Sequence, residues 1–458
     1  MLPFKLIIIL LLFSGWDTSK ADDWPNWMGS SNDGIWHEEG ILKKFPENGA
    51  RYVWKFPIGK GYTGPAVVGG KLYVMDRVES PQEERPKSDP SEEDDQDKAA
   101  TGISEIPGKE RVYCLNAKTG KEVWRYEYDC VYRISYPEGP RTTPLVDGRF
   151  VYTLGAMGDL ICLDHQTGRL VWKKNLPQAY SCKPPVWGFA AHPRIFGERL
   201  VCIVGGENSA VVCFNKHDGK EIWKSGNAKE VGYAPPVPMT LDGTTHLVYW
   251  SDIGINGIDL RTGQEKWSVA FPEVPPTRPT VTIMTPQIFE NKILVSNFYN
   301  GSMVVEVSAA GESARKLWST DPKKNIPKDG LNVLMGSPII REGRIYGFAG
   351  KGEMRCLELE TGKQVWEDKR PANSKRDSYF ATAFITQNQD RYFIFNDQGE
   401  LIIASLNAGG YREVDRTAIL EPSSFVRGRN VVWSHPAYAE RCLFVRNSKE
   451  LVCVDLSE

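Results

Sequence analysis

The side chains able to do chemistry in this 458-residue chain are few and widely scattered. Its six histidines form no pair at metal-binding spacing, and the sequence has neither a phosphate-binding loop nor a nucleophile elbow. Residues 59–64 match the dinucleotide-binding glycine pattern by letter, but Pro65 and a strand-like run at 66–74 follow where that site requires a helix. These patterns argue against a zinc enzyme, a nucleotide-binding enzyme and a serine hydrolase.

A second group of candidates combines aromatic and polar side chains that each precede a predicted short strand. Arg141 is the candidate for an anion or carboxylate contact, because a guanidinium donates paired hydrogen bonds to such a group. The aromatic rings are candidates to stack on a planar ligand or a sugar. The alternative is that these side chains only plug the centre of the fold and stabilise its innermost strands. The seven candidates are Tyr62, Arg141, Trp187, His192, Tyr233, Trp433 and His435.

The elements that must bring these candidates together are repeats. A phrase with a Thr-Gly or Asp-Gly step and a final tryptophan returns about every 50 residues, which is the mark of a repeat architecture. The clear copies occupy residues 115–124, 163–172, 214–223, 258–267 and 357–366.

The repeat at residues 143–172 predicts four short antiparallel strands separated by turn residues. Gly168 permits the positive φ of the last hairpin turn, and Asp164 can accept hydrogen bonds from the backbone of that turn. Trp172, on the fourth strand, would fill the gap to the next sheet. Four strands in about 50 residues is the size of one β-propeller blade.

Counting strands predicts eight blades. The eighth fourth strand, near residues 411–414, lacks a tryptophan, and Gly311 is displaced by an insertion. Third strands are predicted near Val112, Leu160, Val211, Ile255, Val304, Met354, Leu401 and Leu451. The other fourth strands carry Trp54, Trp124, Trp172, Trp223, Trp267, Trp318 and Trp366.

The two ends of the repeat region complement each other. Residues 451–455 form a third strand without a fourth, and residues 52–56 form a fourth strand without a third. Pairing of the two would close the ring and remove exposed sheet edges. We therefore predict an all-β fold, a single eight-bladed propeller over residues 51–458 with no second domain.

The pattern Asp-x-x-Thr-Gly-x-x-x-Trp in such repeats resembles the pyrroloquinoline-quinone (PQQ)-like propeller family. That family includes quinoprotein dehydrogenases and the periplasmic propeller lipoprotein of the outer-membrane β-barrel assembly machinery. The resemblance covers nearly all of the expected mature chain. The opening residues, 23–34, are also similar to the start of secreted bacterial propeller-repeat proteins.

The resemblance implies two kinds of function. PQQ dehydrogenases of the family carry adjacent cysteines, a calcium ion and a catalytic aspartate. This sequence has no adjacent cysteine pair and no Cys-x-x-Cys-His haem motif. We therefore expect a non-catalytic binding or scaffold protein that takes a partner protein or small ligand at its channel mouth or blade faces, with no metal or cofactor. The alternatives are a PQQ-dependent dehydrogenase-like enzyme with a degenerate site, and an envelope assembly factor.

The N-terminus predicts export. Lys5, the apolar run 6–13 and residues 19–21 resemble a secretory signal cleaved after Ala21, and the apolar run is too short for a membrane helix. No cysteine follows for a lipid anchor, and we expect a periplasmic or extracellular protein without a transmembrane segment. The tryptophan-rich extension at 22–50 would seal the ring or bind a partner. A net charge of −2 gives no argument for nucleic-acid binding, and we expect a monomer.

Nine cysteines need explanation in an exported protein. Five of them share one position of the third strand, which Gly257 and Ala404 fill in other repeats, and this predicts a small buried residue. Cys130 and Cys182 lie in equivalent linkers, and the sequence leaves open whether they pair. The five are Cys114, Cys162, Cys213, Cys356 and Cys453.

An acidic insertion at 79–109 separates two strands of the first complete blade. It contains a run of acidic residues at 92–97 and little apolar sequence, which is typical of a solvated loop. A calcium-binding loop and a partner-docking arm are the alternatives, although the spacing of a calcium loop is missing.

Overall fold

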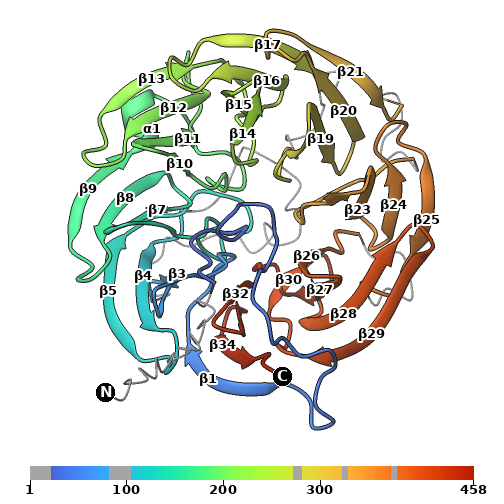
Figure 1. The fold of residues 1–458 in the computed structure, drawn as a ribbon. Coiled ribbons are helices and arrows are strands. Elements are labelled where there is room, and N and C mark those ends of the chain that lie inside the picture. The colour runs from blue at the N-terminus through green and yellow to red at the C-terminus, as the bar shows by residue number, and fades with distance from the viewer. Residues whose placement is uncertain (1–21, 82–104, 272–280, 322–328, 373–378) are drawn as a thin grey trace, which may run out of the picture.

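The computed structural model describes residues 22–81, 105–271, 281–321, 329–372 and 379–458. Eight four-stranded antiparallel sheets stand around a common axis, which confirms the eight-bladed propeller (Figure 1). The predicted signal sequence at 1–21 and residues 82–104 of the acidic insertion lie outside the described residues.

The first three blades after the closing strand are consecutive in sequence, and each runs from its innermost to its outermost strand. They comprise β2 (Ala66–Val68), β3 (Lys71–Glu79), β4 (Gly108–Asn116) and β5 (Glu122–Asp129); β6 (Leu145–Asp147), β7 (Phe150–Leu154), β8 (Asp159–Asp164) and β9 (Leu170–Asn175); and β10 (Arg194–Phe196), β11 (Arg199–Ile203), β12 (Val211–Asn215) and β13 (Glu221–Ser225).

Four further consecutive blades complete the arc. They comprise β14 (Val237–Leu241), β15 (Thr244–Trp250), β16 (Gly254–Asp259) and β17 (Glu265–Ala270); β18 (Gln287–Phe289), β19 (Lys292–Asn297), β20 (Gly301–Val307) and β21 (Ala314–Ser319); β22 (Ile339–Arg341), β23 (Arg344–Phe348), β24 (Met354–Glu358) and β25 (Gln364–Asp368); and β26 (Ala383–Asn388), β27 (Arg391–Asn396), β28 (Glu400–Asn407) and β29 (Gly410–Ala418).

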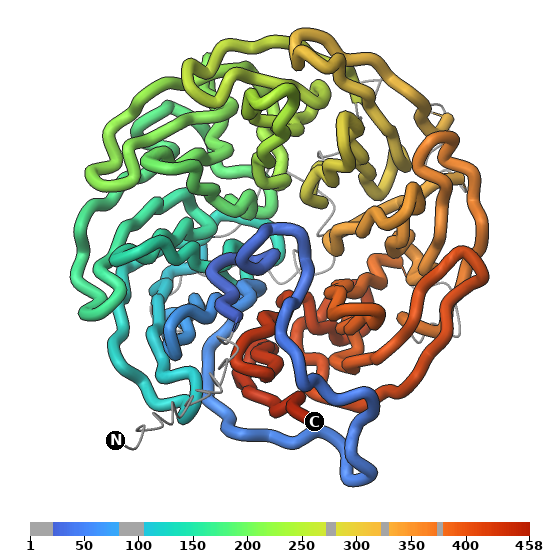
Figure 2. The backbone as a smooth tube through the Cα atoms, in the orientation of Figure 1, coloured from blue at the N-terminus to red at the C-terminus, as the bar shows by residue number. Residues whose placement is uncertain are grey.

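The closing blade joins the two ends of the chain, as predicted. β1 (Arg51–Pro57) pairs with β34 (Glu450–Asp455), and β33 (Cys442–Arg446) and β32 (Ala437–Ala439) complete the sheet. Figure 2 shows the blue and red ends of the tube meeting in this sector. Because the ring closes, the chain ends leave no unpaired sheet edge between neighbouring blades.

The predicted tryptophan contacts join successive blades. The Trp124 indole Nε1 donates to the backbone oxygen of His165 in the next blade at 3.1 Å. A Cβ built on Gly168 of that turn would lie 2.6 Å from Trp124 Cε3, so only glycine fits beneath the ring. Six junctions have the indole hydrogen bond, and its donors are Trp54, Trp124, Trp172, Trp223, Trp318 and Trp366.

One junction departs from this pattern. Trp267 is buried, but its Nε1 has no hydrogen-bond partner among the residues that the structure describes. The displaced Gly311 of the next blade lies against His246 instead, where an added Cβ would come within 2.1 Å of Nε2. The insertion noticed in the sequence therefore removes an indole contact.

The shared cysteine position has a packing reason. Each of the five cysteines is buried and lies directly opposite the tryptophan of its own blade, as Cys114 does opposite Trp124. Gly257 takes the same place opposite Trp267. All nine cysteines lie within the described residues and all are free, so Cys130 and Cys182 do not pair.

The segment at residues 22–50 packs at the junction between the β26–β29 blade and the closing blade, where the outer strand β29 has no tryptophan. Trp36 is fully buried, and its Nε1 donates to Glu38 Oε2 at 2.7 Å. The same carboxylate accepts from the backbone N–H of Arg441 in the closing blade. Asn388 of β26 donates to the backbone oxygens of Trp36 and Glu38. The segment thus crosses the end of the ring first and then joins the β26–β29 blade to the closing blade (Figure 2).

Two smaller elements lie outside the blades. The hairpin of β30 (Ser424–Val426) and β31 (Arg429–Val431) stands near the axis, held by an ion pair of 2.6 Å between Arg429 and the buried Asp397. Helix α1 (Leu176–Tyr180) follows β9. Within the described part of the chain, no helix is long and apolar enough to cross a bilayer.

The irregular junction provides a matched test of indole docking. Replacing Trp124 by Phe removes its hydrogen bond to the backbone oxygen of His165, which still accepts from the Tyr73 hydroxyl at 3.2 Å, whereas Trp267→Phe removes no hydrogen bond to the described residues. We expect Trp124→Phe to lower the free energy of unfolding by about 1 kcal/mol more than Trp267→Phe does. Urea unfolding followed by circular dichroism measures the difference. Equal losses in the two variants would contradict the assigned role of the hydrogen bond.

Candidate functional site

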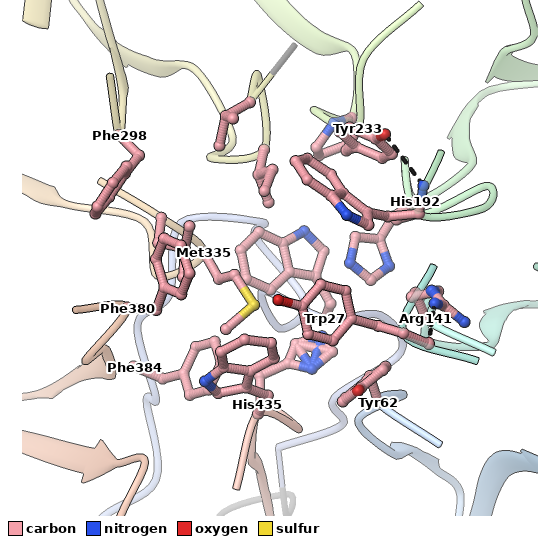
Figure 3. Close-up of a pocket in the computed structure, with 18 of the residues that line it drawn as sticks. Trp27, Tyr62, Arg141, His192, Tyr233, Phe298, Met335, Phe380, Phe384 and His435 are labelled. Carbon is pink, nitrogen blue, oxygen red and sulfur yellow. Dashed lines mark hydrogen bonds between the residues drawn. The ribbon is translucent and has the colours of Figure 1, made fainter. Parts of the chain in front are cut away.

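The structure brings all seven predicted candidates to one cavity on the axis of the ring (Figure 3). They come from loops that precede the innermost strands β2, β6, β10, β14 and β32. Because innermost strands line the axis, the residues just before them converge there. The cavity, called the mouth cavity below, has a volume of about 180 Å³. Its lining includes Tyr62, Arg141, Trp187, His192, Tyr233, Trp433 and His435.

Several lining residues were not among the candidates. Phe298 and Tyr299 come from the turn between β19 and β20, which does not lead into an innermost strand. Phe384 lies on β26 itself. Tyr136 and Phe380 belong to connecting loops. A count of aromatic residues in every loop at this end of the ring would have identified all but Phe384.

Trp27 of the N-terminal segment forms part of the cavity wall. Its ring stacks on His192 with centroids 5.1 Å apart and an interplanar angle of 8°, and it contacts the His435 ring at 5.0 Å. Trp27 also lines a second hollow of about 30 Å³ together with Trp24 and Met28. Its indole therefore separates the mouth cavity from the space beneath the N-terminal segment. The sequence predicted only that this segment would seal the ring or bind a partner.

Two lining residues have a strained backbone. Tyr136 has φ of 51° and Phe380 has φ of 65°. Bulky L-residues rarely adopt this left-handed conformation, which costs roughly 1–2 kcal/mol. A strained backbone persists only where the surrounding packing holds it in place, and strained residues of this kind cluster at ligand sites. Phe380 packs with Phe298 and with Val426 of the β30–β31 hairpin.

The two histidines are held neutral. Burial lowers the pKa of His435 to about 3, and burial followed by the neighbouring His435 and Arg194 lowers the pKa of His192 well below its usual value. The His192 Nδ1 accepts from the backbone N–H of Thr143 at 3.0 Å, so this nitrogen carries no proton. The Thr143 hydroxyl also lies 2.9 Å from His435 Nε2. A general acid or base works best with a pKa near the operating pH, which neither imidazole has.

The polar groups that remain in the wall are donors. Arg141 donates to the backbone oxygens of Gly139, Ser135 and Tyr136, which fixes its position in the wall. The Tyr62 hydroxyl is buried without a hydrogen-bond partner among the described residues. The same holds for the indole Nε1 of Trp27 and of Trp433. Tyr233 is different, because its hydroxyl accepts from the backbone N–H of Trp187 at 3.4 Å (Figure 3).

The cavity does not fit PQQ, the cofactor that the propeller family implies. PQQ carries three carboxylates, and burying them requires several cationic or hydrogen-bonding partners. Arg141 is the sole charged side chain among the described lining residues, and both histidines are neutral. The described residues also contain no cluster of three or more histidine, cysteine or acidic side chains placed to hold a metal ion.

The histidine pair predicts acid sensitivity of the fold. Because the folded-state pKa of each lies below its unfolded value of about 6.5, the stability they confer is complete above that pH and is lost as the pH falls. For His435 the loss continues to about pH 3. We expect the unfolding free energy of His435→Gln to fall less steeply below pH 6.5, by up to about 1.4 kcal/mol per pH unit. Chemical unfolding between pH 7 and 4.5 measures the slopes, and identical slopes would refute the assignment.

Comparison with known proteins places the chain by sequence and by fold. The family model described as outer membrane protein assembly factor BamB matches residues 108–331 and 309–458. The BamB of Burkholderia pseudomallei is 23% identical over 236 residues, which is 51% of this chain and 56% of that relative. The chain thus matches little more than half the length of that curated protein.

Solved structures support the fold alone. The crystal structure of BamB from Moraxella catarrhalis matches with a TM-score of 0.53 at 14% identity, covering 88% of this chain and 97% of that one. Quinohemoprotein alcohol dehydrogenase from Comamonas testosteroni matches with a TM-score of 0.58 at 13% identity, covering 95% and 81%. A fold shared by an assembly factor and an enzyme does not select a function. The sequence match does identify the family, and this chain belongs to the BamB family of PQQ-like repeat propellers.

Proposed function

We propose that this protein is a non-catalytic binding protein of the cell envelope that engages its partner at the mouth cavity. The observation that carries the proposal is a preformed aromatic cavity with buried donors that have no partner in the described part of the chain. Buried donors without partners are costly in a protein interior, and a ligand that accepts from them would offset the cost. Preformed apolar cavities with a few convergent polar groups are the usual form of ligand sites.

The chemistry of the wall supports binding over catalysis. The two imidazoles are held neutral, and burial raises the pKa of Tyr62 and of Tyr233 above the usual value. Proton transfer near neutral pH needs a group whose pKa lies close to that pH. Arg141 is anchored to three backbone oxygens, which suits it to orient a bound group.

Family membership favours one particular binding role, which is a role in assembly of the cell envelope. The relatives in the comparison are outer membrane protein assembly factors. The predicted export signal would carry the protein to the same compartment. A binding role as part of an assembly complex needs no cofactor, and it agrees with a cavity that does not fit PQQ.

Photo-crosslinking distinguishes the mouth from the blade edges. Phe425 of β30 is 66% exposed and is followed by Val426, which packs with the cavity residue Phe380, whereas Ile222 of β13 is 44% exposed on an outer strand. With a benzophenone amino acid at each position, we expect position 425 to capture an outer-membrane assembly protein in intact cells. The matched position 222 should capture little of it. Capture from position 222 alone would move the binding site to the blade edges.

Titration with PQQ tests the enzymatic alternative. Because three carboxylates would face one guanidinium, we expect micromolar PQQ with calcium to leave tryptophan fluorescence unquenched after correction for absorbed light. Trp27, Trp187 and Trp433 line the cavity, so binding there would be visible. Quenching that is lost in Arg141→Ala, or turnover of alcohols or aldose sugars, would favour the quinoprotein alternative.

A further inference from the structure

We infer that the mouth cavity takes one ring-sized apolar group that bears a single carboxylate, an inference that rests on the proposed binding role of this cavity. The same chemistry occurs in a free aromatic acid and in an aromatic residue at the carboxyl terminus of a partner chain. Size, the kind of polar group in the wall and net charge each restrict the occupant independently.

The volume restricts the apolar part to about one ring. A cavity of about 150 Å³ in an unrelated protein accommodates benzene. The mouth cavity, at about 180 Å³, is slightly larger, which leaves room for a short substituent on the ring. Phe298, Phe380 and Phe384 provide an apolar wall against which such a ring would pack.

The wall requires acceptors from its ligand. Four side chains that line the cavity can donate to a ligand. The hydroxyl of Tyr62 and the indole nitrogens of Trp27 and Trp433 have no partner among the described residues, and the three backbone hydrogen bonds of Arg141 use three of its five N–H groups. A carboxylate has two oxygens and about four acceptor sites, so one such group can serve several of these donors. Three of the four lie close together, because the Tyr62 ring is 6.0 Å from that of Trp433 and the Arg141 guanidinium is 5.4 Å from the Tyr62 ring.

The charge of the wall sets the charge of the ligand. Arg141 contributes one positive charge, and no aspartate or glutamate is among the described lining residues. An aromatic enclosure without a cation would suit a quaternary ammonium group, but here the guanidinium opposes it. One carboxylate balances one guanidinium, whereas the three carboxylates of PQQ leave an excess of two negative charges in an apolar site.

The contacts between Arg141 and the backbone support this arrangement. Three carbonyl oxygens hold the guanidinium against the loop at 135–141, so the guanidinium is oriented before a ligand arrives. Tyr136 of the same loop has the strained φ described above and lines the cavity. A ligand therefore meets a wall whose polar groups need little rearrangement, which raises affinity.

Binding of small probes to the full-length protein tests the inference by isothermal titration calorimetry. The probes are 3-phenylpropionate, its neutral amide, and the cation benzyltrimethylammonium. We expect the carboxylate to bind at least ten-fold more tightly than the amide, and the cation more weakly than both. Stronger or equal binding of the amide or the cation would overturn the inference, as would no binding of any probe.

Variants assign the binding to the cavity. Tyr62→Phe removes only a hydroxyl for which the described residues provide no partner, and we expect it to weaken the binding of 3-phenylpropionate about five-fold. Trp433→Phe should act similarly. The control Tyr438→Phe removes a buried hydroxyl from β32, outside the cavity lining, and should bind as the wild type does. Equal affinity of Tyr62→Phe, Trp433→Phe and wild type would overturn the assignment, whatever the behaviour of Arg141 variants.

Peptides separate the two sources of the ligand. Gly-Gly-Phe with a free carboxyl terminus, compared with its amidated form, probes a chain end, and 3-phenylpropionate probes a free acid. Carboxylate-dependent binding of the peptide identifies a chain end, whereas binding of the free acid alone identifies a small metabolite-like ligand, and both support the inferred chemistry. If position 425 captures a partner while all carboxylates fail to bind, the binding function stands and this inference falls.

Discussion

The contact between an indole and a turn glycine of the next blade is the interaction on which the ring depends. A blade is a small sheet that cannot bury both faces alone, so its stability comes from its neighbours. Trp124 and Gly168 show the constraint, because any Cβ at position 168 would collide with the ring at 2.6 Å. The hydrogen bond from the same indole to a backbone oxygen fixes the orientation as well as the distance. The indole hydrogen bond recurs at six junctions and the glycine contact at five of them, and this repetition sets the spacing of successive blades.

The N-terminal segment replaces that contact where β29 lacks a tryptophan. Trp36 and Glu38 link β26 to the closing blade through a buried carboxylate and two backbone oxygens. The same segment carries Trp27 to the axis, where its ring stacks on that of His192 and contacts the tilted ring of His435. Closure of the ring and construction of the mouth cavity are therefore physically connected. A change that loosens the segment from Asn388 would disturb the cavity wall as well as the ring.

The candidate site shows which lining residues a repeat pattern can predict and which it cannot. Tyr62, Arg141 and Tyr233 are far apart in sequence, yet each precedes an innermost strand, and innermost strands meet at one axis by symmetry. That reasoning needs only the repeat boundaries, and the structure places the seven residues that it selected around one cavity. It missed Phe298, whose turn does not precede an innermost strand, because a repeat pattern does not reveal how far a large side chain reaches across the axis.

The sequence by itself determined the fold, because the same turn glycine and tryptophan recur at a fixed spacing and the chain ends supply complementary strands. Only the tertiary structure decided the character of the site. The histidines are neutral and several donors lack partners among the described residues because these groups are buried. The guanidinium is anchored because neighbouring backbone oxygens point toward it. Neither the burial nor the direction of these backbone groups can be read from the sequence. It also decided that Cys130 and Cys182 stay apart, since equivalent positions in successive blades need not bring two sulfur atoms within bonding distance.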